Sequence, residues 1–267
     1  MEQLYVFGTG NATATRYYNT CFALKKGQEF FMVDAGGGNG IIRILNDMKV
    51  DLTHIHNLYV SHAHTDHILG VIWMVRIIGT RMKSGMYEGE LNIYGHKNLV
   101  TVLDTLCKLT LQKKFYDLIG DKIHLIPVSD GESRSILGCD VTFFDIHSNK
   151  MEQYGFTMAL NDDKQLTFCG DEPLHPLCEK YAKSCNWLLH EAFCLYEERE
   201  KFKPYEKHHS TVKDSCELAN QLGVEHLILW HTEDSHGSLR KDLYLKEGTP
   251  FFTGTLEVPE DGEILPL

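Results

Sequence analysis

The feature that most constrains this chain is the run Ser-His-Ala-His-Thr-Asp-His at residues 61–67, which follows a short apolar segment typical of a buried strand. In an extended segment alternate side chains face the same side, so His62 and His64 can bind one ion. If the chain then turns into a helix, Asp66 and His67 face a second ion. Imidazole and carboxylate groups suit zinc and similar divalent ions. The run predicts a metal centre rather than a polar loop with clustered histidines.

Strand-like and helix-like segments alternate along the chain. Apolar β-type segments lie at 4–7, 20–24, 30–33, 58–60, 91–95, 123–128, 141–146, 155–160, 165–168, 187–190 and 226–230, and helical spacing is found at 40–50, 68–78, 96–109 and 210–222. Near the C-terminus, 239–247 is compatible with a helix and 251–258 with a closing strand or a partner contact. This pattern predicts a layered α/β architecture with outer helices. Without repeats or linkers, residues 1–267 are expected to form a single domain.

The composition indicates where in the cell the protein is located and which partners it can bind. The formal net charge is −11, from 37 acidic and 26 basic residues, and such a field repels a long polyanion. Eight scattered cysteines without a C-x-x-C pair are typical of free thiols in a reducing compartment. The N-terminus shows no export signal, and the apolar run 68–75 is too short to span a bilayer. We expect a cytoplasmic protein with no membrane association.

The sequence S-H-A-H-T-D-H-I-L-G resembles the H-x-H-x-D-H signature of the metallo-β-lactamase superfamily. The resemblance implies an αββα metallo-β-lactamase sandwich, two mixed sheets flanked by helices, with the site at one edge of the sheets. It also implies three later ligands, and His147, Asp171 and His231 each follow a β-type segment in the matching order.

The same resemblance divides the ligands between two ions. His147 is expected to join His62 and His64 on the first ion, and His231 to join Asp66 and His67 on the second, while Asp171 bridges both. The complete expected set is His62, His64, Asp66, His67, His147, Asp171 and His231.

Further motifs resemble the ribonuclease Z-like branch of this superfamily. They are Phe7-Gly8-Thr9-Gly10, His190-Glu191-Ala192-Phe193 and His209-Ser210-Thr211. The resemblance implies that His209 assists at the scissile phosphate, that Glu191 supports it, and that Asp66 orients or deprotonates the attacking water. The alternative interpretation of His208-His209 is a helix-capping region.

Two departures from that branch bear on the substrate. Ribonuclease Z carries a long arm that grips transfer RNA between the third histidine and the bridging aspartate, but here residues 148–170 suffice only for a hairpin. After the last ligand, the usual serine-arginine continuation is replaced by Thr232-Glu233-Asp234, which adds negative charge. Both changes argue against a transfer-RNA substrate and leave the metal chemistry intact.

These observations predict a two-metal phosphodiesterase that uses a metal-bridging hydroxide on a small-molecule or nucleotide phosphodiester. Cleavage of a tRNA precursor is the second alternative, with a homodimer partner in place of the missing arm, since members of this group are often dimers. Hydrolysis of a non-phosphate bond (a thioester, lactone, β-lactam or sulfate ester) and a non-catalytic binding module stay open, because fold does not dictate function. Two divalent ions per chain are expected, with zinc preferred and manganese or iron as alternatives.

Two other segments have simpler interpretations. The glycines at 36–38 lack the Lys-Ser/Thr ending of a phosphate-binding loop and are interpreted as a turn close to the metal site. The charge run at 197–201 is interpreted as the solvated face of a helix.

Overall fold

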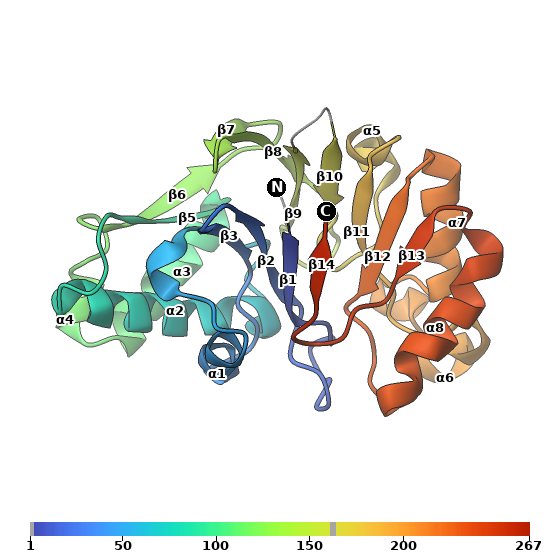
Figure 1. The fold of residues 1–267 in the computed structure, drawn as a ribbon, viewed down its shortest axis with the longest axis horizontal. Helices are drawn as coiled ribbons and strands as arrows, with labels where there is room; N and C mark the ends of the chain where they lie inside the picture. Colours follow the sequence, from blue (N-terminus) through green and yellow to red (C-terminus); the bar gives the residue numbers. More distant parts are fainter. Residues whose placement is uncertain (1–2, 161–163) are drawn as a thin grey trace. The chain divides into compact units, whose positions relative to one another are not determined.

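A computed structural model describes residues 3–160 and 164–267, and the chain divides into two compact units (Figure 1). The first unit comprises Met1–Gly8, Tyr18–Ser129 and Gly262–Leu267, and the second comprises Thr9–Tyr17 and Asp130–Asp261. Each unit therefore contains segments that are distant in sequence, and each has its own sheet and its own hydrophobic core.

The first unit contains a seven-stranded mixed sheet in the order β14-β1-β2-β3-β4-β5-β6. Its strands are β1 (Gln3–Gly8), β2 (Cys21–Lys26), β3 (Glu29–Val33), β4 (Ile55–Tyr59), β5 (Leu91–His96), β6 (Ile123–Val128) and β14 (Ile264–Pro266). Pairing is antiparallel from β14 to β3 and parallel from β3 to β6. Because β3 and β4 run in the same direction, their carboxyl ends lie at the same edge of the sheet.

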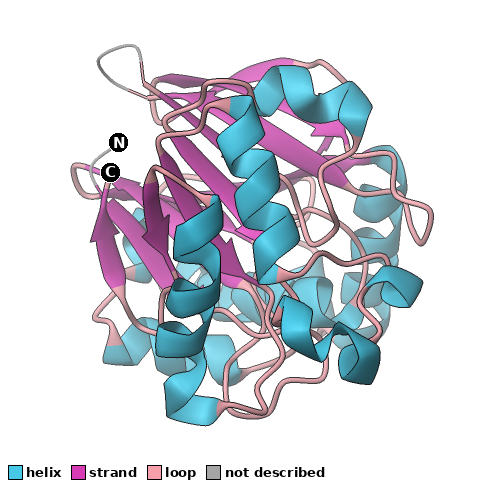
Figure 2. Cartoon of the chain, turned by 90° about the vertical axis from the view of Figure 1, so that its right-hand side faces the viewer, coloured by secondary structure: helices cyan, strands magenta, loops and turns pink. Residues whose placement is uncertain are grey.

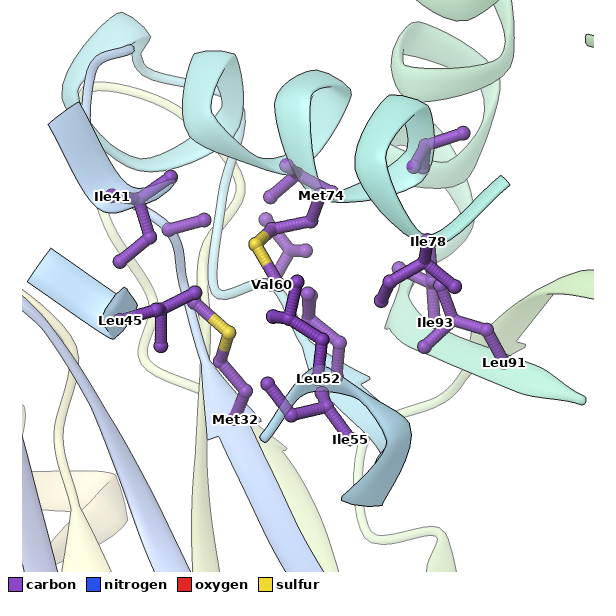
Figure 3. Packing of buried hydrophobic residues seen from close by; sticks show 14 of the residues in the cluster. Met32, Ile41, Leu45, Leu52, Ile55, Val60, Met74, Ile78, Leu91 and Ile93 are labelled. Atoms are coloured by element: carbon purple, nitrogen blue, oxygen red, sulfur yellow. The ribbon is translucent and has the colours of Figure 1, made fainter. Parts of the chain in front are cut away.

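Helices pack on this sheet through a dense apolar layer. They are α1 (Gly40–Asp47), α2 (Thr65–Lys83), α3 (Lys97–Thr110) and α4 (Lys113–Tyr116), with a 3-10 turn at Leu52–His54. Figure 3 shows Met74 and Ile78 of α2 directed at Val60 and Ile93 of the sheet. Burial of these side chains is the main force that fixes α2 on the sheet.

One glycine allows α2 to approach the turn that follows β3. The amide of Gly70 donates to the carbonyl of Gly36 over 2.7 Å, and a β-carbon at Gly70 would lie 1.8 Å from the carbonyl oxygen of Ala35. No other residue fits at such a contact, so Gly70 fixes the first turns of α2 against residues 34–36. The glycine-rich segment is thus a turn that contacts the helix carrying Asp66 and His67.

The second unit contains a seven-stranded mixed sheet in the order β13-β12-β11-β10-β9-β8-β7. Its strands are β7 (Ser133–Ile136), β8 (Cys139–Asp145), β9 (Tyr154–Ala159), β10 (Gln165–Phe168), β11 (Trp187–Glu191), β12 (His226–Trp230) and β13 (Thr255–Glu257). Pairing is antiparallel from β7 to β10 and parallel from β10 to β13. The carboxyl ends of β8, β10, β11 and β12 therefore lie at one edge of this sheet.

The helices of the second unit are α5 (Glu179–Ala182), α6 (Arg199–Phe202), α7 (Val212–Leu222) and α8 (Arg240–Gly248). Short 3-10 turns are found at Pro176–Cys178, Tyr196–Glu198, Tyr205–Lys207, Gly237–Leu239 and Thr249–Phe251. Helix α7 begins with a capping box between Thr211 and Asp214 and ends at Gly223 in the left-handed conformation. It contacts β11 and β12, and Figure 2 shows helices in front of the strands on this side of the unit.

The layered α/β fold is confirmed, with two mixed sheets flanked by helices. The expected segments correspond to observed helices and strands, and 251–258 contains β13. Strands β7 and β14 have no counterpart among the expected segments, because both are short and β7 is also weakly apolar. Within the described residues no helix is long and apolar enough to cross a membrane. The single-domain assignment stays a prediction, since the chain divides into the two units described above.

The buried face of α2 gives a stability test. Ile78 is fully buried, so Ile78→Ala removes apolar contacts and leaves a cavity, and we expect the free energy of unfolding to fall by about 2–5 kcal/mol. Lys83→Ala on the exposed side of the same helix is the control and should change it by less than about 0.5 kcal/mol. Urea unfolding of the metal-free protein followed by circular dichroism measures both values. Similar losses in the two variants would contradict the packing described here.

Candidate metal centre

The histidine run lies where the sequence analysis expected it, between the end of β4 and the start of α2. His62 lies in the segment between them, and His64, which is in extended backbone, is the N-cap residue of α2. Asp66 and His67 occupy the first turn of that helix and are buried. Nε2 of His62 lies 2.7 Å from Nδ1 of His64, so two imidazole nitrogens converge on one point. The predicted change from strand spacing to helix spacing is thus observed.

A carboxylate that the sequence analysis did not single out holds this run in place. Asp34, at the end of β3, is 1% exposed and accepts hydrogen bonds from the backbone amide of Ser61 (2.8 Å) and from its hydroxyl (2.7 Å). Nδ1 of His67 lies 2.8 Å from the same carboxylate. A carboxylate behind a histidine fixes the ring orientation and increases its basicity as a ligand. Asp34 therefore positions the ligands without belonging to the predicted set.

These hydrogen bonds determine which ring nitrogens can bind an ion. Because Asp34 only accepts, Nδ1 of His67 carries a proton, so Nε2 is the nitrogen that can bind an ion once it gives up its own proton. The Ser61 hydroxyl donates to Asp34, so it accepts from Nδ1 of His62 at 3.0 Å, and Nε2 of His62 carries the lone pair. Both imidazoles thus present the nitrogen that a metal ion requires.

The surroundings of His67 also favour positive charge. Burial by itself lowers the pKa of His67, but the nearby carboxylates of Asp66 and Asp34 overcome this effect and raise the pKa well above its ordinary value. Nε2 of His67 lies 3.3 Å from Oδ2 of Asp66. Two carboxylates and several imidazoles in a buried site form a donor set that fits a divalent cation.

The three later candidates lie at one edge of the second sheet. His147 follows β8, Asp171 follows β10 and His231 follows β12. His147 and His231 have φ angles of 60° and 54°, a left-handed conformation that is uncommon outside glycine and is concentrated at functional sites.

Asp171 and His231 are close together, whereas His147 is more exposed. Oδ2 of Asp171 lies 3.5 Å from Nε2 of His231, and Oδ1 accepts a hydrogen bond of 2.7 Å from the side chain of Gln153. His147 has a 40% exposed side chain, with Nδ1 3.8 Å from Asp145 and its ring against His175. The seven predicted ligands therefore fall into a group of four in the first unit and a group of three in the second. Their joint binding of two ions stays a prediction.

His209 and Glu191 meet as the sequence analysis proposed. Glu191 is the last residue of β11 and is fully buried, and its Oε2 lies 3.5 Å from Nδ1 of His209 while its Oε1 accepts from the amide of Ser210. The ring of His209 stacks on Phe193 at 5.0 Å and lies 5.3 Å from the ring of His231. Of the two residues in the helix-capping interpretation, His208 is the C-cap residue of the 3-10 turn Tyr205–Lys207, whereas His209 is not a cap, since the N-cap of α7 is Thr211.

A lysine that the sequence analysis missed lies on the other side of His209. Nζ of Lys150 is 3.4 Å from Nε2 of His209 and 3.6 Å from Oε1 of Glu172. Ser148 organises this loop, because its hydroxyl donates to Glu172 and accepts from the amide of Lys150. The position of Lys150 depends on a loop contact with residues far along the chain, so no local sequence signal indicates it.

His190, from the same motif as Glu191, has a structural role. Burial lowers its pKa, so it is neutral. Its Nε2 accepts from the amide of Leu174 and its Nδ1 lies 2.8 Å from the carbonyl of Glu191. His190 thereby fixes the loop that follows Asp171.

A cavity of about 240 Å³ opens beside His147 and His209 in the second unit. It is lined by Ile146, His147, Asn149, Glu172, Pro173, His175, Tyr205, His208 and His209. The hydroxyl of Tyr205 donates to Asp214 over 2.9 Å, which fixes the ring at the wall. Small-ligand sites of drug-like size occupy roughly 300–1,000 Å³, so this cavity suits a smaller group.

Comparison with known proteins agrees with the site and the fold. Ribonuclease Z of Parabacteroides distasonis is 20% identical over 297 aligned residues, which cover 94% of each chain. The crystal structure of the metallo-β-lactamase fold protein YhfI from Bacillus subtilis superposes with a TM-score of 0.80 at 17% identity, covering 100% of this chain and 99% of that one. Human tRNase Z, short form (ELAC1), gives a TM-score of 0.76 at 17% identity over 98% of both chains.

The chain thus has the metallo-β-lactamase fold and is homologous to ribonuclease Z, a class of metal-dependent hydrolases. Within that class, residues 2–245 match the family described as Anti-Pycsar protein Apyc1, and the chain belongs to this family. The expected fold and the expected resemblance to ribonuclease Z are confirmed.

The arrangement around Asp34 generates a prediction about metal affinity. Asp34→Asn keeps the size of the side chain and tolerates the φ angle of 54°, but its amide nitrogen donates and cannot accept. Either the Ser61 amide, or the Ser61 hydroxyl together with His67, therefore loses its acceptor. We expect the metal affinity to fall by about 10–100-fold, as for other residues that orient metal ligands. Calorimetric titration with zinc measures this, with Asp47→Asn on the exposed side of α1 as control. An unchanged affinity would show that Asp34 has no positioning role.

Proposed function

We propose that this chain is a two-metal phosphodiesterase acting on a small, nucleotide-sized phosphodiester. The seven predicted ligands would hold two divalent ions, with zinc as the preferred metal. The observation that carries the proposal is the placement of His209 between Glu191 and Lys150, beside a cavity that also contains His147. A histidine whose Nδ1 lies beside a carboxylate and whose Nε2 lies beside a cation is suited to binding a phosphate group.

The metal ions and the protein groups have separate tasks in this reaction. When bound, two divalent ions supply a water of lowered pKa and neutralise charge on the phosphate. Asp34 and Ser61 orient His67 and His62, and Gln153 orients Asp171. Asp66 accepts the proton of the attacking water. His209 stabilises the developing charge or protonates the leaving oxygen, with Glu191 behind its Nδ1.

A small substrate is favoured over transfer RNA for two reasons. Between His147 and Asp171 the described residues form two paired strands, β9 and β10, with no room for a long arm. The cavity of about 240 Å³ suits one nucleoside-sized group.

The family is named for an anti-Pycsar protein, and we propose the same role for this chain. We further propose a cytoplasmic location and a homodimer.

Processing of tRNA precursors is the second candidate function, because the curated relatives are named ribonuclease Z and one structural neighbour is a tRNase Z. Incubation of the metal-loaded protein with a tRNA precursor tests it. Cleavage at the tRNA 3′ end with an efficiency above that for small diesters would favour this function over the proposed one.

The first kinetic prediction separates metal binding from catalysis. With zinc or manganese, we expect turnover of a chromogenic nitrophenyl phosphodiester. Asp171→Ala should lose the activity together with bound metal, whereas His209→Ala should keep its metal and lose about 10²–10⁴-fold in kcat, the usual contribution of a general acid or base. Metal analysis beside steady-state kinetics distinguishes the two effects. A normal rate in His209→Ala would remove this residue from the mechanism.

The position of Tyr205 at the cavity wall predicts that its ring stacks on the base of a nucleotide substrate, a contact that simple diesters lack. Tyr205→Ala removes an aromatic ring at the wall, and base stacking contributes about 1–3 kcal/mol, so KM for a nucleoside nitrophenyl phosphodiester should rise roughly 5–100-fold. KM for methyl nitrophenyl phosphate should not change, since it has no base. Tyr116→Ala in the first unit, whose hydroxyl also binds an aspartate, is the matched control. Equal effects of Tyr205→Ala on both substrates would exclude a base-binding cavity.

A further inference from the structure

A second cluster of metal-binding side chains lies in the second unit and shares no residue with the seven predicted ligands. Its members are Glu198 at the end of the 3-10 turn Tyr196–Glu198, Glu233 in the segment after β12, and His236 before the turn Gly237–Leu239. One oxygen of each glutamate and one nitrogen of the histidine all lie within 4.8 Å of one another. Glu197, Glu200 and Lys201 are exposed, in agreement with the interpretation of residues 197–201 as a solvated helix face, whereas the Glu198 side chain is only 22% exposed.

The geometry is close to that of a three-ligand site. Nε2 of His236 lies 2.7 Å from Oε2 of Glu198 and 3.9 Å from Oε1 of Glu233. Ligands bound to one zinc ion at about 2.0–2.2 Å in tetrahedral geometry lie roughly 3.3–3.6 Å apart. The two distances to Nε2 of His236 differ from this range by about 0.3–0.6 Å, and the two glutamate oxygens lie within 4.8 Å of each other.

One carboxylate oxygen of Glu233 is buried without a hydrogen-bond donor, and a bound cation would stabilise it. The Glu233 side chain is only 7% exposed, and its Oε1 has no hydrogen-bond donor, although Oε2 accepts from the amide of Ser235. A buried carboxylate oxygen without a donor is costly. This oxygen faces Nε2 of His236, which already contacts Glu198 at the shorter distance. An ion bound among the three side chains would satisfy it.

The cluster contains two carboxylates but only one imidazole that contacts both of them. Lys201 contacts only the other oxygen of Glu198. Burial raises the pKa of the adjacent Cys194 thiol to about 12, and the charges of Glu233 and Glu198 add to this increase. A divalent cation bound between Glu198 and Glu233 would neutralise the negative charge of these two carboxylates.

The ligands are held by the backbone, and the site is open to solvent on one side. The amide of Glu233 donates to the carbonyl of Phe193, which ties the segment after β12 to the chain after β11. Glu198 and His236 keep 22% and 23% of their side-chain surface exposed. An ion can therefore enter, and a water molecule can complete its coordination.

From this geometry we infer an additional site for a divalent transition-metal ion at Glu198, Glu233 and His236. Two carboxylate oxygens and one imidazole nitrogen fit zinc. The site lies outside the predicted reaction centre, and the inference does not rest on the proposed function.

Zinc stoichiometry tests the inference directly. The full-length protein and its variants are saturated with zinc, passed through a desalting column and analysed by elemental mass spectrometry. We expect His236→Ala and Glu233→Gln to bind one zinc ion fewer per chain than the unmodified protein. His54→Ala is the matched control, because His54 forms a comparable contact of 3.0 Å with Glu29 but has no third, buried carboxylate. It should bind as much zinc as the unmodified protein.

A second measurement keeps the test valid if a variant folds poorly. His64→Ala combined with Asp171→Ala leaves the cluster intact, so this double variant should retain one zinc ion that is lost when His236→Ala is added. This outcome is independent of any hydrolytic activity, so it separates the inference from the proposed function. Equal zinc content with and without His236→Ala in both backgrounds overturns the inference and leaves a His236–Glu198 ion pair.

Discussion

The buried carboxylate of Asp34 is the interaction on which the histidine run depends. The carboxylate accepts hydrogen bonds from Ser61 after β4 and from His67 in α2, and the backbone amide of Asp34 donates to the carbonyl of Tyr59. Asp34 thereby joins three segments of the chain. The parallel pairing of β3 and β4 brings the two strand ends together, and Gly70 lets α2 approach the turn after β3. The packing of α2 on the sheet, through residues such as Ile78, therefore also fixes the orientation of the histidines. Fold stability and ligand geometry are linked through this carboxylate.

Functional side chains in both units follow the ends of strands, where the backbone leaves the sheet. Asp34, His147 and His231 all adopt positive φ angles there. Such a conformation costs free energy for a non-glycine residue and persists only where the surroundings determine it. Hydrogen bonds at strand ends, such as that from the amide of His147 to Asp145, supply part of this constraint.

The local parts of the site were predictable from the sequence, and the non-local parts were not. His62, His64, Asp66 and His67 lie within one strand-to-helix transition, so their spacing alone indicates how the side chains are directed. Asp34 was missed because its role depends on contacts with residues 61 and 67, and the only local signal is an aspartate between a strand and a glycine turn. The partial burial of Glu198 within the run at 197–201 was not predictable, because it depends on a contact with His236 that a helix pattern cannot indicate. Strand β14 was missed because only its pairing with β1 defines it.

The net charge of −11 repels an anionic substrate, so the proposed reaction requires positive charge close to the reacting phosphate. Bound metal ions would supply part of this charge, and Lys150, which lies beside His209 and Glu172, supplies more. This positive charge is local. A single phosphodiester group would lie within reach of it, since the Debye length at physiological ionic strength is about 8 Å. The cavity beside His209, which suits one small group, lies where such a phosphodiester would meet this charge in the proposed reaction.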